Sequence, residues 1–248
     1  MKTKIDFELL LEKGAIELGV VLDKEQINSF MTFKSLVLEW NEKMNLTTVS
    51  DGLDFLVKHY LDSLSVAKYL ESGAKIVDVG TGAGFPGIPI LLAQKNALMT
   101  FIDSLKKRLT FLEYAIEKLG RKECLLVHSR AEDAGRNNEY REKYDFAVSR
   151  AVAGLGLLSE YCLPLIKPGG AFIAMKGPKV AEELAAAMTV IEKLGGELSL
   201  VDEIILPFYD LMGEKISRTI LVIKKIRQTP LKYPRKSQEL SKVYKKSD

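Results

Sequence analysis

The sequence predicts an α/β fold in which a doubly wound, seven-stranded sheet with an antiparallel last strand follows an N-terminal helical extension. Three observations predict it. Short apolar runs alternate with helix-length segments from residue 75 onward, two later runs are joined only by a loop, and the first 72 residues show helical periodicity. We therefore expect a helical extension over 1–72, an α/β domain over 73–226 and a basic tail over 227–248.

The helical extension begins with a recognisable helix start. Asp23 is followed three residues later by Gln26, which favours a capping box, and apolar residues across 27–40 recur at helical spacing. The run Asn45-Leu46-Thr47 interrupts this pattern. A second helical stretch is expected from about 54 to 73.

The α/β domain contains seven predicted strands, each a short apolar run rich in residues that favour sheets. They cover 76–79, 98–103, 124–129, 146–149, 171–175, 200–206 and 218–226, and the predicted helices cover 87–95, 105–119, 154–164 and 178–194. Strands separated by helix-length segments pair in parallel through right-handed crossovers. The last two strands are joined only by a loop around Gly213, which is too short for a crossover helix, so we expect them to pair antiparallel.

A glycine-rich run follows the first predicted strand. Gly80, Gly82 and Gly84 permit a tight turn, in which backbone N–H groups approach a ligand that a Cβ atom would block. Gly82, Gly84 and Gly87 also form a literal G-x-G-x-x-G, so a dinucleotide site stays open as an alternative.

Acidic residues stand where a nucleoside cofactor would need them. Asp78, at the end of the first strand, is placed to accept from an ammonium group or to cap the turn. Asp103, about 20 residues past the glycines, is placed to accept from two ribose hydroxyls or to cap the next helix. Ala131 and Glu132 follow the third strand, where they would read an adenine edge or belong to an ordinary polar loop.

Three features favour S-adenosylmethionine over a nicotinamide dinucleotide. They are the carboxylate of Asp78 just before the first glycine, the antiparallel finish of the sheet and the surplus helical region at the N-terminus. Nicotinamide dehydrogenase domains keep their sheet parallel, whereas this topology is typical of Rossmann-like, class I methyltransferases. A nicotinamide-dependent oxidoreductase remains the rival class.

The composition bears on the cellular location of the protein and on whether it binds a metal ion. No apolar stretch approaches the roughly 18 residues that a membrane span needs, and the N-terminus has no apolar signal core, so we expect a cytoplasmic protein. Cys124, Cys162, His59 and His128 form no ligand cluster in the sequence, so we expect free thiols and no metal site.

Positive charge is concentrated at the C-terminal end. Residues 224–248 carry nine Lys or Arg against two acidic residues, whereas the whole chain has a net charge of only +3. Together with Tyr233 and Tyr244, these cations are suited to gripping phosphates and stacking on bases. A flexible, solubilising end is the alternative.

Several motifs in this order resemble the RsmG family, also called glucose-inhibited division protein B. They are Trp40-Asn41-Glu42-Lys43-Met44-Asn45-Leu46-Thr47, His59-Tyr60-Leu61-Asp62-Ser63-Leu64, the run from Asp78 to Pro89, Asp103-Ser104-Leu105-Lys106-Lys107-Arg108, Ser149-Arg150-Ala151 and Met175-Lys176-Gly177. The resemblance implies methylation of N7 of one guanine in the 530 loop of 16S rRNA, with S-adenosylmethionine as donor. By position it also implies cofactor contacts at Gly80, Phe85, Ala131, Glu132 and Arg150.

Methylation at guanine N7 needs no general base, because N7 carries a lone pair and no proton. The sequence agrees with such a reaction, since it has no N-P-P-Y box and neither cysteine follows a proline. We hypothesise that Arg150 and Lys176 position the guanine without acting as acids or bases; a salt bridge at the rim is the alternative for Arg150. The candidates for RNA binding are Arg235, Lys236, Asn45 and His59. For the last two, a helix-capping or buried polar role is equally compatible with the sequence. The tail departs from the family pattern from Ser237 onward.

The expected partner is 16S rRNA or a precursor of the small subunit, bound by a monomer. Two other functions remain open: methylation of a small molecule with the same cofactor, and RNA binding without catalysis. The basic tail argues against the first of these.

Overall fold

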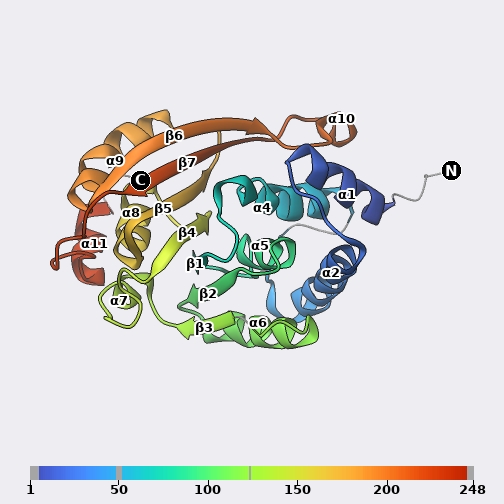
Figure 1. The fold of residues 1–248 in the computed structure, drawn as a ribbon, viewed down its shortest axis with the longest axis horizontal. Helices are drawn as coiled ribbons and strands as arrows, with labels where there is room; N and C mark the ends of the chain where they lie inside the picture. The colour runs from blue at the N-terminus through green and yellow to red at the C-terminus, as the bar shows by residue number, and fades with distance from the viewer. Residues whose placement is uncertain (1–5, 49–51, 123, 245–248) are drawn as a thin grey trace.

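The computed structural model describes residues 6–48, 52–122 and 124–244, and a seven-stranded sheet forms its centre (Figure 1). The strand order is β3-β2-β1-β4-β5-β7-β6. The strands are β1 (Lys75–Val79), β2 (Leu98–Asp103), β3 (Cys124–His128), β4 (Tyr144–Arg150), β5 (Ile166–Lys176), β6 (Gly196–Ile205) and β7 (Ser217–Lys225). The first five strands pair in parallel and β7 runs antiparallel to both β5 and β6, which confirms the predicted sheet.

Two strands, β5 and β6, begin four or more residues earlier than the sequence predicted. β5 begins at Ile166 because Tyr144 pairs with Ile166 before a register shift, although Pro168-Gly169-Gly170 resembles a turn in the sequence. β6 begins at Gly196 with a mixture of polar and apolar residues and contains a second irregularity at 198–200. Both differences arise from strand pairing, which local hydrophobic patterns do not report.

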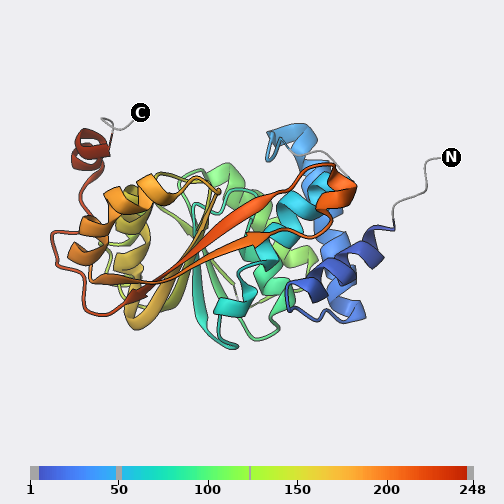
Figure 2. The ribbon, with the colours of Figure 1, turned by 90° about the horizontal axis from the view of Figure 1, so that it is seen from above.

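Helices cover both faces of the sheet (Figure 2). They are α5 (Gly87–Ala93), α6 (Lys106–Lys118), α7 (Ala131–Ala134), α8 (Leu155–Cys162) and α9 (Ala181–Lys193). Successive strand residues face opposite sides: Ile76 belongs to the cluster that contains α5 and α6, and Val77 belongs to the cluster that contains α8 and α9. The two-residue period of the strand therefore creates two separate cores.

The N-terminal helices α1 (Phe7–Glu17) and α2 (Lys24–Met44) share the first of these cores. The predicted capping box is present, because Asp23 accepts from the backbone of Gln26 and the Gln26 side chain accepts from the backbone of Asp23. The Gln26 amide also donates to the carbonyl groups of Leu92 and Ala93, each at 2.9 Å. These bonds attach the start of α2 to the end of α5.

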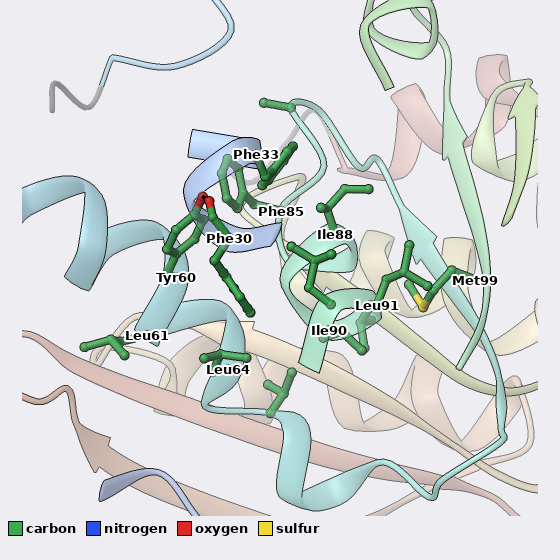
Figure 3. Packing of buried hydrophobic residues seen from close by; sticks show 14 of the residues in the cluster. Phe30, Phe33, Tyr60, Leu61, Leu64, Phe85, Ile88, Ile90, Leu91 and Met99 are labelled. Carbon is green, nitrogen blue, oxygen red and sulfur yellow. Dashed lines mark hydrogen bonds between the residues drawn. The ribbon is translucent and has the colours of Figure 1, made fainter. Parts of the chain in front are cut away.

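An aromatic cluster joins the helical extension to the glycine-rich turn (Figure 3). Phe30 and Phe33 of α2 contact Tyr60, and Phe33 also contacts Phe85 in the turn. The Tyr60 hydroxyl donates to the Phe30 carbonyl at 2.6 Å, so this buried polar group is satisfied. The turn is therefore packed against α2 through large apolar rings.

The second predicted helical stretch has an unusual backbone. It consists of α3 (Leu53–Phe55), a π-helical segment η1 (Leu56–Leu61) and α4 (Asp62–Leu64), followed by a short 3-10 turn η2 (Ala67–Tyr69). π-Helical turns are rare and occur frequently at functional sites. This one carries Lys58 and His59.

The described part of the basic tail, residues 227–244, is a packed segment. After β7 the chain passes beside α7 and ends in α11 (Ser237–Tyr244), whereas α10 (Tyr209–Met212) lies in the β6–β7 hairpin at the opposite end of the molecule (Figure 1). The predicted tail residues 245–248, with Lys245 and Lys246, lie outside the described residues. In the described part of the chain no helix is long and apolar enough to cross a membrane.

Candidate functional site

The turn after β1 is built around the buried carboxylate of Asp78. Its Oδ2 accepts from the Thr81 hydroxyl at 2.7 Å and from the Gly87 N–H at 3.0 Å, so it holds both ends of the turn. Its Oδ1 is buried and has no hydrogen-bond partner among the described residues. Burial raises the pKa of Asp78 to about 7, against the lowering effect of these two hydrogen bonds. The turn therefore contains one carboxylate oxygen that lacks a donor.

Glycine is required in this turn for two different reasons. Gly80, Gly82 and Gly84 all have positive φ angles, which other residues rarely adopt. At Gly87 a Cβ atom would lie 2.4 Å from the Phe101 ring, so α5 could not pack this closely against β2.

Beside this turn, the carboxyl ends of β1 to β4 surround a cleft of about 450 Å³, which we call the glycine-turn cleft. Its lining includes four predicted residues, namely Gly80, Asp103, Ala131 and Glu132. Arg108, Val152, Leu157 and Tyr161 also line it. Such a crevice at the carboxyl ends of parallel strands is where α/β sheets bind ligands.

Asp103 holds the turn from the side of β2. Its Oδ2 accepts from the Gly82 N–H at 3.0 Å and lies 3.3 Å from Nη1 of Arg108, and its Oδ1 accepts from the Leu105 N–H at 2.8 Å. The helix-capping alternative is not realised: Leu105 is the N-cap of α6 and makes no side-chain cap hydrogen bond, and the Leu105 N–H that Asp103 accepts from precedes the helix. The carboxylate lies in the wall of the cleft.

Glu132 lies at the far end of the same cleft, in the first turn of α7. Its side chain is buried, and its Oε1 accepts from the hydroxyl of Ser237 in the tail. Oε1 also lies 3.9 Å from Nη1 of Arg130. The carboxylate is thus held from two sides.

A second cleft of about 700 Å³ adjoins the first at Ala151, whose φ of 55° bends the chain after β4. We call it the cationic cleft, because five Lys or Arg side chains and only two carboxylates line it. These charged residues are Lys58, Arg150, Lys176, Lys215, Arg218, Asp62 and Glu214. The excess of positive charge suits a phosphate-bearing partner.

Arg150 is fixed within the cationic cleft by the π-helical segment. Nη1 donates to the Lys58 carbonyl at 2.8 Å and to Oδ2 of Asp62 at 2.9 Å. Nη2 lies 3.2 Å from Nδ1 of His59, and the guanidinium lies over the Phe85 ring. The salt-bridge alternative for Arg150 is therefore present, and it leaves the guanidinium in the lining of the cleft.

His59 is uncharged and contacts Arg150, Thr47 and Phe85. Burial first, and the charge of Arg150 second, lower its pKa to about 3. Because Arg150 is a donor, Nδ1 must accept, and Nε2 then carries the proton toward Oγ1 of Thr47, 2.9 Å away. The ring also stacks on Phe85 with centroids 4.3 Å apart. The sequence placed His59 in the site but did not reveal this arrangement.

The remaining predicted residues occupy different places. Lys176 lines the cationic cleft and pairs with Glu183 at 2.7 Å, whereas Phe85 is packed in the aromatic cluster. Asn45 is the left-handed C-cap of α2 and is exposed. In the tail, Arg235 pairs with Glu160, and Lys236 is exposed. The structure thus brings His59, Arg150 and Lys176 together but places Asn45, Arg235 and Lys236 outside the lining of both clefts.

Asp62 and Arg218 are among the residues of the cationic cleft that were not singled out from the sequence. Asp62 accepts from Nε of Arg218 through Oδ1 at 2.9 Å, while its Oδ2 binds Arg150. Asp62 and Arg218 are 156 positions apart, so no local spacing connects them. The motif that begins at His59 contains Asp62 and was the only sequence signal near it.

Across residues 6–48, 52–122 and 124–244, no group of three His, Cys, Asp or Glu side chains is arranged to hold a metal ion. Cys162 is buried and is a free thiol, and Cys124 is half-buried.

Comparison with solved structures agrees with this fold. TYW2 from M. jannaschii in complex with AdoMet aligns with a TM-score of 0.51 and 15% identity, over 66% of this chain and 77% of that chain. TYW2 from P. horikoshii in complex with MeSAdo aligns with a TM-score of 0.53 and 14% identity, over 71% and 64%. At such low identity the likeness shows a shared fold alone.

Comparison of sequences is more specific. The ribosomal RNA small subunit methyltransferase G of Alkaliphilus oremlandii is 51% identical over 237 residues, which are 94% of this chain and 96% of that protein. The protein of the same name from Acetivibrio thermocellus is 48% identical over 234 residues, 94% of each chain. The GidB family model, described as rRNA small subunit methyltransferase G, matches residues 26–206. This chain therefore belongs to the GidB family of rRNA small subunit methyltransferases.

Proposed function

We propose that this protein transfers a methyl group from S-adenosylmethionine to N7 of a guanine in the 530 loop of 16S rRNA. Membership of the family supports the reaction, and the resemblance noted in the sequence supplies the guanine, the atom and the loop. One structural observation carries the proposal: the glycine-turn cleft and the cationic cleft meet at Ala151. A cofactor in the first and a nucleotide in the second would be neighbours.

The glycine-turn cleft fits the proposed cofactor. The buried Oδ1 of Asp78 lacks a donor among the described residues, and because Asp78 lies behind Val79 and Gly80 of the cleft lining, an ammonium group in the cleft would reach it through water. Asp103 in the wall of the cleft suits the ribose, and Ala131 and Glu132 suit the adenine edge. When bound, S-adenosylmethionine supplies a methyl group on a sulfonium, which is an electrophile.

The protein's own part in the reaction is alignment. Guanine N7 has a lone pair and no proton, so no side chain must act as a base. Arg150, fixed by Asp62 and His59, is placed to donate to guanine O6, and Lys176 offsets phosphate charge near the same cleft. Correct alignment of two reactants contributes on the order of 7–11 kcal/mol to catalysis.

The α/β domain and the helical extension have different tasks in this proposal. Residues 73–226 hold the cofactor, and residues 1–72 contribute Lys58, His59 and Asp62 to the cationic cleft. Since a single chain lines both clefts, a monomer is sufficient. The partner is 16S rRNA or a small-subunit precursor, which places the protein in the cytoplasm.

The test is mass mapping of 16S rRNA from cells with and without the gene, combined with transfer of tritium from labelled S-adenosylmethionine to small-subunit RNA in vitro. We expect one guanine of the 530 loop to lose a methyl group in the deletion strain, and the purified protein to restore it. Label that appears in a small-molecule fraction but not in RNA would contradict the proposal, and so would binding of NAD in place of S-adenosylmethionine.

A further inference from the structure

The tail is attached to the loop that follows α7. The guanidinium of Arg141 donates to the carbonyl groups of Gly135 and Tyr233, both at 2.8 Å, and to that of Thr229 at 2.6 Å. Arg136 donates to the Pro234 carbonyl at 2.7 Å. Two side chains of the same loop thus fix the main chain of the tail beside α7, the element that carries Ala131 and Glu132.

A buried acid on α8 depends on the same segment. Glu160 is fully buried, and the partners that the described residues supply to it come from the tail. Its carboxylate accepts from the backbone N–H of Arg235 at 3.2 Å, from Nε of Arg235 at 3.0 Å and from the Tyr244 hydroxyl at 2.9 Å. A buried carboxylate without such partners is costly. The body of the protein therefore contains a buried carboxylate whose hydrogen-bond partners are supplied by the tail.

This anchoring places Ser237 against the wall of the glycine-turn cleft. Ser237 begins α11, two residues after Arg235, and its hydroxyl donates to Oε1 of Glu132. The contact from Arg130 also engages Oε1. Oε2 of Glu132 is therefore the oxygen left to accept from a ligand in the cleft.

The same end of the cleft suits an adenine ring. Ala131, Leu157 and Tyr161, from α7 and α8, line the cleft with Glu132 and offer apolar surface to a flat base. At C6, adenine carries an exocyclic amino group, which is a donor, whereas guanine and hypoxanthine carry a carbonyl oxygen, which is an acceptor. A carboxylate oxygen held at a fixed angle is a suitable acceptor for the amino group.

We infer that Ser237 is a positioning residue for the cofactor: anchored by the Arg235–Glu160 pair, it orients Glu132 to accept from the adenine amino group. This inference rests on the proposed function, since it assumes S-adenosylmethionine in the glycine-turn cleft. It gives the C-terminal segment a part in cofactor recognition, in addition to any contact with RNA.

The test compares two ligands in the full-length protein by calorimetry. The probes are S-adenosylhomocysteine and S-inosylhomocysteine, in which an oxygen replaces the amino group. We expect the wild type to prefer the adenine ligand, and Ser237→Ala to reduce this preference about 2- to 10-fold, the value of one net hydrogen bond. Ser237→Thr keeps a hydroxyl and should keep the preference.

Ser241→Ala is the matched control, because Ser241 is in the same helix and its hydroxyl bonds only to the Gln238 carbonyl among the contacts of the described residues. An unchanged preference in Ser237→Ala, or an equal reduction in Ser241→Ala, would overturn the inference. Failure of the wild type to bind S-adenosylhomocysteine at all would instead overturn the proposed function. Thermal unfolding of each variant shows whether its fold is retained.

Discussion

Nη1 of Arg150 lies 2.9 Å from Oδ2 of Asp62, and this ion pair joins the end of β4 to the helical extension. Asp62 is buried and also binds Arg218, so one carboxylate compensates two guanidinium groups. The pair fixes the residue that we place beside the target guanine. Its removal should affect stability and catalysis together.

Replacement of Asp62 by Ala should lower the free energy of unfolding by about 3 kcal/mol, because two partly buried cations would be left without their carboxylate. Urea denaturation followed by circular dichroism measures this change. Asp54→Ala is the control: Asp54 pairs with Lys58 at 3.0 Å on the surface, and we expect less than about 0.5 kcal/mol there. If the two substitutions lowered the free energy of unfolding equally, the buried pair would contribute no more to stability than the surface pair.

Replacement of Arg150 by Lys should slow methylation of small-subunit RNA about 10- to 100-fold in single-turnover reactions, since lysine lacks the planar fork that binds Asp62 and faces the base. Arg227→Lys is a suitable control, because Arg227 is exposed and donates to the Glu192 carbonyl, away from both clefts. Normal single-turnover rates and normal RNA affinity in Arg150→Lys and Arg150→Ala would remove Arg150 from the site.

Binding of S-adenosylhomocysteine should strengthen as the pH rises through 7. Burial raises the pKa of Asp78 to about 7, so at pH 6 the carboxyl is mostly neutral and at pH 8 it is mostly charged. Only the charged form pairs with the ligand's ammonium group. We expect about 10-fold tighter binding at pH 8 than at pH 6, measured by calorimetry.

Two variants separate this effect from a general weakening of binding. Asp78→Asn should bind weakly at both pH values and show no pH dependence, because no carboxyl remains to titrate. Asp103→Asn should also bind more weakly and keep a pH dependence, moved to somewhat lower pH because the charge of Asp103 helps to raise the pKa of Asp78. The expectation fails if wild-type binding is independent of pH between 6 and 8.

The exposed lysines of the tail should contribute to RNA binding by pairing with phosphates. Lys236 and Lys242 are exposed at α11, whereas Arg235 is already paired with Glu160. In Lys236→Gln/Lys242→Gln the slope of log affinity against log salt should fall by roughly 0.7–0.9 for each lysine–phosphate pair that the substitutions remove. Filter binding at several salt concentrations measures it.

The control for this experiment is Lys13→Gln/Lys24→Gln. Both lysines are exposed on α1 and α2, at the end of the molecule opposite to α11 (Figure 1). A salt slope that changes equally in the two double variants, or in neither, would show that the tail does not bind phosphates specifically. Substitution is preferable to deletion here, because deletion would also remove the partners of Glu160.

Much of the fold could be predicted because its signals are local. The turn at Gly80, the alternation of Ile76 and Val77 between two faces, and the capping box at Asp23 each depend on residues a few positions apart. The short loop around Gly213 similarly required an antiparallel hairpin. The sequence by itself therefore determined the order of strands and helices along the chain and the position of the glycine-rich turn.

Only the tertiary structure decided which distant side chains meet. Arg150 is on β4, Asp62 is on α4 and Arg218 is on β7. Their ion pairs form because the fold brings the end of β4, α4 and the start of β7 together. The sequence predicted Arg235 as an RNA contact, but in the structure its guanidinium is paired with the buried carboxylate of Glu160. The physical reason is that burial and pairing of charges depend on neighbours contributed by the whole fold, which residue spacing along the chain does not report.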